Sequence, residues 1–239
     1  QLKASALLDA IRRPTPAANA KNDNGVAGAL LSEGQNKRVL LVDHQDSFVH
    51  TLANYVRQTG AQVITIRSNP QKVGLEEAEI DRLAKEFGPF DMALLSPGPG
   101  NPSDFQVPQT IEYLEKRRIP IFGVCLGLQG MIERYGGKLG ILPVPMHGKP
   151  SVVEIKGDKD KGIFADLPEE IVCGRYHSLF CSDLPTDLSV TAQTADGCIM
   201  AIRHKTLPVA AVQFHPESIL TAPGCGVRML ANALTYLRY

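Results

Sequence analysis

The sequence predicts an α/β protein, with a mostly parallel central sheet flanked by helices and smaller β-rich additions in its second half. From Lys37 to Val124, short apolar runs alternate with amphipathic segments of about 10–15 residues, as in successive βαβ units. The apolar runs are continuous, which is typical of parallel strands buried on both faces. After Gly137, β-rich segments follow one another at shorter spacing.

Each expected element follows from its local pattern. Four continuous apolar runs predict the parallel strands, at residues 39–42, 63–66, 92–95 and 119–124. Apolar stripes at helical spacing predict helices from Asp46 or Ser47 to Gly60, over 75–87, over 106–118, after 125, and over about 225–238. Residues that favour strands predict further β-segments near 150–156, 188–193, 198–203 and 208–214.

The first 36 residues differ from the rest. Leu2, Ala6, Leu7 and Ile11 fall near one face of a short amphipathic helix. The stretch 13–36, rich in Pro, Ala, Asn and Gly, then has the composition of a linker. We therefore expect residues 1–36 to be the tail of an upstream domain with its tether, and residues 37–239 to form one domain. The initial Gln in place of Met also indicates a longer polypeptide.

Composition narrows the classes of function. The 25 basic residues balance the 25 acidic ones and Trp is absent, so neither nucleic acid nor a membrane surface is expected as a partner. The longest nearly apolar stretch, 119–132, is too short to span a bilayer, and the start of the chain lacks the features of a secretory signal. Five cysteines without a CxxC pair indicate a reducing cytoplasm.

A cysteine lies where a buried strand should pass into a helix. Cys125 is flanked by Gly123 and Gly127, which allow a tight turn that presents the sulfur at the carboxyl edge of the sheet. The dipole of the following helix would favour the thiolate over the thiol. The sequence around it also fits a small buried cysteine without chemistry. The other four cysteines, Cys173, Cys181, Cys198 and Cys225, have no comparable setting.

A second candidate group follows the segment 209–214. His215 lies at the end of an expected strand, and Glu217 comes two residues later, so its carboxylate could orient the imidazole of a general base. A solvated surface turn is the alternative. His44 and His50 are expected at the surface or packed against helices. Cys173, His177 and Cys181 match no familiar zinc spacing, so no metal site is expected.

The turn after the third strand alternates proline with glycine. In Ser96–Pro102, the amides of the glycines are unshielded by side chains, and such amides can donate to a developing oxyanion. A rigid loop without function is the alternative. A dinucleotide fingerprint is excluded because its third glycine is missing.

Four motifs in this order, SPGPGNP, GVCLGLQ, GRYHSL and FHPES, resemble those of the class I (triad) glutamine amidotransferases. The segments DHQDSF and MHGKP are most similar to the amidotransferase component of anthranilate synthase and its aminodeoxychorismate synthase relatives. The resemblance covers about residues 37–239 and implies a flavodoxin-like fold. The upstream helix and linker resemble the junction of fused chains, in which a synthase precedes the amidotransferase.

The resemblance also implies residue roles. Cys125 would be the nucleophile, His215 the base and Glu217 its orienter. The amides of Gly98 and Leu126 would form the oxyanion hole. The residues implied to hold L-glutamine are Gly98, Pro99, Gly100, Gln129, Ser178 and Leu179. The loop His147, Gly148 and Lys149 is a candidate docking surface, or alternatively an exposed basic turn. Leu128 departs from the family pattern, because many relatives carry His there.

The implied activity is hydrolysis of glutamine, with ammonia passed to a chorismate-converting synthase that is expected upstream on the same chain. No cofactor is implied for this domain, and Mg²⁺ is expected only in the partner's chorismate-binding domain. The product could be anthranilate, aminodeoxychorismate or a phenazine precursor. A catalytically silent scaffold domain and a stand-alone thiol hydrolase remain alternatives.

Overall fold

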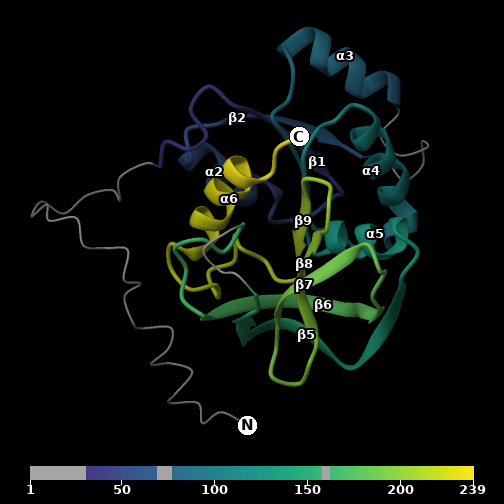
Figure 1. Cartoon of the computed structure of the whole chain (residues 1–239), viewed down its shortest axis with the longest axis vertical. Coiled ribbons are helices and arrows are strands. Elements are labelled where there is room, and N and C mark those ends of the chain that lie inside the picture. Colours follow the sequence, from purple (N-terminus) through teal and green to yellow (C-terminus); the bar gives the residue numbers. More distant parts are fainter. Residues whose placement is uncertain (1–30, 69–76, 158–161) are drawn as a thin grey trace, which may run out of the picture.

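The computed structural model describes residues 31–68, 77–157 and 162–239. Their strands form one nine-stranded sheet in the order β2-β1-β3-β4-β9-β8-β7-β5-β6 (Figure 1). The helix expected near the start of the chain lies outside the described residues. Residues 31–36 pack on the body of the domain: Gly34 N donates to Thr59 O at 2.8 Å, and Glu33 pairs with Arg228.

Five strands make the parallel half of the sheet, one more than the four parallel strands predicted, because the segment near 208–214 was expected only as a further β-segment. They are β1 (Arg38–Asp43), β2 (Gln62–Arg67), β3 (Met92–Leu95), β4 (Ile121–Val124) and β9 (Val209–Val212). β3, β4 and β9 are buried along their whole length, and β1 is buried from its second residue onward. Continuous apolar runs therefore identified β1, β3 and β4 correctly, because strands covered on both faces need no polar alternation. β2 was also predicted, although its residues are exposed or only partly buried.

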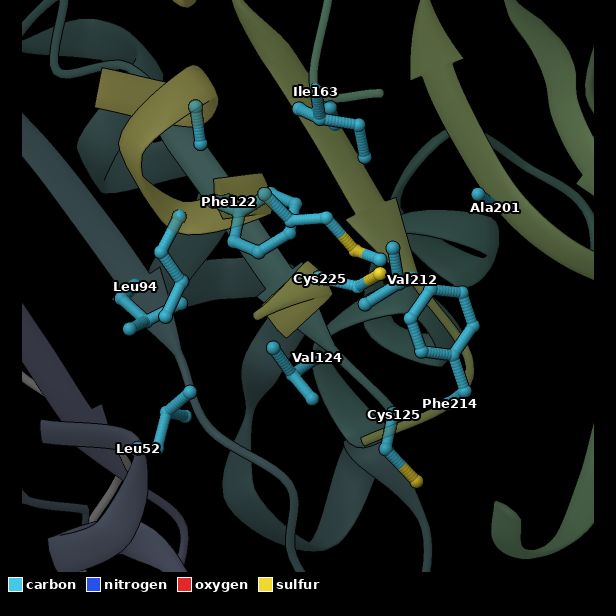
Figure 2. Packing of buried hydrophobic residues seen from close by; sticks show 14 of the residues in the cluster. Leu52, Leu94, Phe122, Val124, Cys125, Ile163, Ala201, Val212, Phe214 and Cys225 are labelled. Carbon is cyan, nitrogen blue, oxygen red and sulfur yellow. The ribbon is translucent and has the colours of Figure 1, made fainter. Parts of the chain in front are cut away.

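Helices cover both faces of this half. On one face, α2 (Val49–Gln58) and α6 (Cys225–Tyr236) pack on a cluster that includes Leu94, Phe122 and Val212 (Figure 2). On the other face, α3 (Glu77–Phe87), α4 (Val107–Lys116) and α5 (Leu126–Arg134) cover Leu40, Leu95 and Ile121. The short 3-10 helix η2 (Pro102–Phe105) precedes α4. No described helix is long and apolar enough to cross a membrane.

The second half of the sheet is antiparallel. It comprises β5 (Lys138–Ile155), β6 (Glu170–Asp183), β7 (Leu188–Gln193) and β8 (Ile199–His204). The sequence pattern predicted β7, β8 and only the last part of β5, and it predicted no strand at 170–183. The pairing of β5 with β6 slips at three places, so neither strand shows regular alternation.

The topology brings the ends of several strands to one edge. β1, β3, β4 and β9 are parallel neighbours, so the residues that follow them converge at the carboxyl edge of the sheet. An isolated bridge between Gly174 and His215 ties β6 to the same edge. Figure 2 shows Cys125 at this end of the core, with its sulfur pointing away from the packed cluster.

Candidate active site

Cys125 occupies a strained turn between β4 and α5. Its backbone angles are φ 53° and ψ −96°, a region that residues with a Cβ rarely adopt. Its amide still donates to Val212 O at 2.8 Å, which continues the pairing of β4 with β9. The two flanking glycines are needed for close packing, because a Cβ on Gly127 would lie 2.9 Å from Leu95 O. The turn therefore holds the sulfur at the sheet edge, as expected.

His215 and Glu217 lie in a pinned turn after β9. The His215 Nδ1 donates to Glu217 Oε1 at 2.7 Å, and both side chains are buried. The backbone of His215 is fixed on both sides, since its amide donates to Gly174 O and its carbonyl accepts from Thr221 Oγ1. The hydrogen bond to the carboxylate leaves Nε2 as the free nitrogen of the ring, and Nε2 has no hydrogen-bond partner in the described part of the chain.

Cys125 and His215 line the same pocket, whose volume is about 210 Å³. Burial alone would lower the pKa of His215. The sulfur of Cys125 and the carboxylate of Glu217 outweigh burial and raise that pKa well above its ordinary value. The structure thus brings together the thiol, imidazole and carboxylate that the sequence placed far apart, in a setting that favours the protonated imidazole of His215.

The proline–glycine turn closes over this pocket. Pro97, Gly98 and Pro99 line it, and a Cβ on Gly98 would lie 2.7 Å from His44 O and 2.8 Å from Leu126 Cδ2. Gly98 is therefore wedged beside the residue that follows Cys125. Neither the Gly98 nor the Leu126 amide donates a hydrogen bond within residues 31–68, 77–157 and 162–239, so both donors are available to a ligand.

His44 supports this turn from beneath. Of the two settings expected for it, at the surface or packed against a helix, the surface is wrong. The side chain is fully buried, its amide donates to Ser96 Oγ at 2.8 Å, and its Nδ1 donates to Ser96 O at 3.0 Å. Burial lowers the pKa of His44 to about 4, although Ser96 and Asp43 oppose the shift. His50 is exposed, as predicted.

The other candidate glutamine-binding residues do not line the pocket. Gly100 has φ 75° and lies against the Asp104 carboxylate. Gln129 Nε2 lies 3.5 Å from Leu179 O, which joins α5 to β6. Ser178 Oγ lies 3.2 Å from His147 Nε2.

The candidate docking loop is part of β5. His147 is exposed, Gly148 has φ 64° at a slip in the strand pairing, and Lys149 Nζ donates to Pro145 O. Two large apolar side chains of the same strand are also exposed, Ile141 at 75% and Val144 at 63%. This strand therefore presents an apolar surface next to the basic loop.

Three side chains in the site were not predicted from the sequence. Gln213 is fully buried, and its Nε2 donates to Cys125 Sγ at 3.5 Å. The rings of Tyr176 and Phe48 lie 4.9 Å and 6.2 Å from that of His215. A glutamine directly after the apolar run of β9 was the available signal, because a buried amide needs partners.

No group of three or more His, Cys, Asp or Glu residues in the described ranges is arranged to hold a metal ion. In the Cys173, His177 and Cys181 set, both ring nitrogens of His177 are already hydrogen-bonded, one to Arg175 and one to Leu179 O.

The chain belongs to the class-I glutamine amidotransferase family, whose model matches residues 40–235. The resemblance drawn from the four motifs is therefore confirmed.

Within this family, the chain is similar to anthranilate synthases and to an aminodeoxychorismate synthase. The chain is 49% identical over 240 residues to an anthranilate synthase of Azospirillum brasilense, a match that covers 99% of this chain and 30% of that protein. It is 43% identical over 201 residues to an aminodeoxychorismate synthase of Streptomyces griseus, covering 82% of this chain and 25% of the relative. It is 39% identical over 203 residues to anthranilate synthase component 2 of Methanocaldococcus jannaschii, covering 82% and 95%.

The chain thus spans less than a third of the two longer relatives and nearly all of the shorter one. Among solved structures, a glutamine amidotransferase from Thermotoga maritima has a similar fold, with a TM-score of 0.58 and 18% identity, covering 76% of this chain and 76% of that one.

Proposed function

We propose that this chain carries out the glutaminase half-reaction of anthranilate synthase, with Cys125 as nucleophile, His215 as general acid and base, and Glu217 as its orienter. The observation that supports the roles most strongly is the shared pocket of Cys125 and His215, together with the 2.7 Å hydrogen bond from His215 to Glu217. The match to component 2 proteins along nearly their whole length supports the choice of reaction.

The proposed chemistry has two steps. The Cys125 thiolate attacks the side-chain amide carbon of L-glutamine, and the amides of Gly98 and Leu126 donate to the resulting oxyanion. His215 then protonates the nitrogen as the C–N bond breaks, which releases ammonia and leaves a glutamyl thioester. Water that has lost a proton to His215 attacks the thioester, breaks the C–S bond and releases glutamate.

Substrate selection would fall to the residues around this centre. Gly98 and Pro99 line the pocket directly. Gly100, Gln129, Ser178 and Leu179 complete the proposed glutamine site. Gln129 and Leu179 are already joined by a hydrogen bond, so two segments 50 positions apart in the chain are held in one arrangement.

The proposed acceptor of ammonia is chorismate, bound in a synthase domain upstream on the same chain. Ammonia must arrive unprotonated to attack, so the two sites need a dry connection. His147, Gly148 and Lys149 are the proposed docking residues, and exposed Ile141 and Val144 on the same strand suit an apolar contact. Mg²⁺ is expected only in that synthase, and the proposed location is the cytoplasm.

An experiment with purified protein tests the proposal. Glutamate release from glutamine is measured for the wild type and Cys125→Ser, with and without a chorismate-binding synthase, and anthranilate formation is measured by fluorescence. Loss of glutamate release in Cys125→Ser supports the nucleophile, and unchanged release contradicts it.

Aminodeoxychorismate synthesis is a second candidate, favoured by the 43% identity to the Streptomyces griseus protein. The glutaminase chemistry is the same, so the product made with the native synthase distinguishes the two.

A further inference from the structure

A buried amide connects the nucleophile to the rest of the site. Gln213 follows β9, its backbone amide donates to Met200 O at 2.8 Å, and its side chain is fully buried. The side-chain Nε2 lies 3.5 Å from Cys125 Sγ, and the Oε1 lies 3.4 Å from Gln129 Nε2. Both ends of this amide are therefore engaged.

The network fixes which end of the Gln213 amide faces the sulfur. Leu179 O is a backbone carbonyl and only accepts, so the Gln129 atom beside it must be the NH₂ group. That same NH₂ group faces Gln213, so Gln213 must present its oxygen to Gln129. The NH₂ group of Gln213 is then the end that points at Cys125 Sγ.

Leu179 O, the carbonyl that fixes the orientation of Gln129, is itself held in place. His177 Nε2 accepts from Arg175 Nε at 3.0 Å, because an arginine is always the donor. A neutral His177 therefore carries its proton on Nδ1, which donates to Leu179 O at 2.7 Å. Burial lowers the pKa of His177 to about 4, so the neutral form persists at neutral pH. Arg175 and His177 are both buried, which protects these bonds from water.

We propose that Gln213 is a positioning residue that donates a hydrogen bond to the Cys125 thiolate, and that Gln129 and Leu179 O fix the direction of that donor. An N–H donor aimed at sulfur stabilises the thiolate over the thiol, because the charged form accepts the stronger hydrogen bond. The inference rests on the proposed function for its consequence in glutamine hydrolysis, although thiolate stabilisation itself does not depend on the substrate.

Alkylation by iodoacetamide measures the thiolate directly and needs no glutamine. The rate is followed by mass spectrometry on the peptide that contains Cys125, from pH 5 to 9, with Cys125→Ser as the blank. Burial raises the pKa of the other four cysteines, Cys173, Cys181, Cys198 and Cys225, so burial disfavours their thiolate forms in the folded protein.

Two substitutions remove the donor. Gln213→Met keeps the length of the side chain, and Gln213→Glu places a carboxylate oxygen against the sulfur. At pH 7 we expect about tenfold slower alkylation for Gln213→Met and a larger loss for Gln213→Glu, with both rate profiles displaced to higher pH. Gln109→Met, the same change at an exposed position of α4, is the matched control and should leave the rate unchanged.

Variants are compared only where circular dichroism shows a folded protein. Unchanged alkylation profiles in folded Gln213→Met and Gln213→Glu overturn the proposal. If both fail to fold, Gln129→Met decides, because it keeps Gln213 but removes the group that orients it. Several-fold slower alkylation in that variant supports the proposal, and an unchanged rate overturns it. If the variants show these alkylation effects but the wild type does not release glutamate from glutamine, the proposed function is contradicted and the role of Gln213 is not.

Discussion

Burial of a neutral histidine beneath the carboxyl edge of the sheet predicts a specific loss of stability in acid. The pKa of His44 falls from 6.5 to about 4 in the folded protein. As the pH drops below about 6.5, His44 binds a proton in the unfolded chain but not in the folded chain, so folding becomes less favourable. The contribution is fully present above pH 6.5 and is lost progressively down to about pH 4.

The size of this effect follows from the shift. A change of one pKa unit corresponds to about 1.4 kcal/mol, so His44 should cost about 3 kcal/mol of unfolding free energy by pH 4 and about 2 kcal/mol at pH 5. This is a sizeable part of a typical total of about 5–15 kcal/mol.

Urea unfolding at pH 7.5 and pH 5.0 isolates the His44 contribution. The test variant is His44→Asn, whose amide can still donate to Ser96 O but does not titrate. The difference in unfolding free energy between the two pH values should shrink by about 2 kcal/mol relative to the wild type. His50→Asn, at an exposed position of α2, should leave that difference unchanged. An equal pH difference in the wild type and His44→Asn would refute the reasoning.

Three further predictions concern the turns around the site. In Gly98→Ala, the new Cβ would lie 2.7 Å from His44 O, so the turn must shift, and kcat for glutamine hydrolysis should fall about 100-fold in a folded protein. In Gly226→Ala, the Cβ would lie 1.9 Å from Pro216 O, so the unfolding free energy measured with urea should fall by about 2 kcal/mol or more. Gly136→Ala is the comparison, because its Cβ would have no atom within 4 Å and any loss there reports only the strain of its φ of 88°. Glu217→Gln removes a charge that raises the pKa of His215, so that pKa, followed by NMR titration, should fall, and an unchanged value would contradict the pairing.

Most strands of the parallel half were predictable because burial on both faces gives them a continuous apolar sequence. β3, β4 and β9 are each four residues long and buried throughout, so their sequences are simply apolar. β5 could not be recognised in the same way. Its first half contains Pro143 and Pro145, exposes Ile141 and Val144, and pairs with β6 through slips in register.

β6 was missed for a different reason. It buries Arg175 and His177, which sequence patterns assign to the surface. Their burial is tolerated because the two side chains are hydrogen-bonded to each other, with Arg175 Nε donating to His177 Nε2. For His44 the sequence left both a surface and a helix-packing position open, since its partner Ser96 is 52 positions away and only the converging strand ends bring the two together.

The candidate site depends on both halves of the sheet. The parallel strands place the Cys125 thiol and the His215 imidazole at one edge, where the sequence motifs predicted them. β6 supplies the contacts that orient them: Gly174 O accepts from the His215 amide, and Leu179 O accepts from Gln129. Ser178, between these two points, contacts His147 on the candidate docking strand. The strand that sequence could not predict is therefore the one that contacts His215, Gln129 and the candidate docking strand, so the geometry of the candidate site depends on β6 as much as on the strands that carry Cys125 and His215.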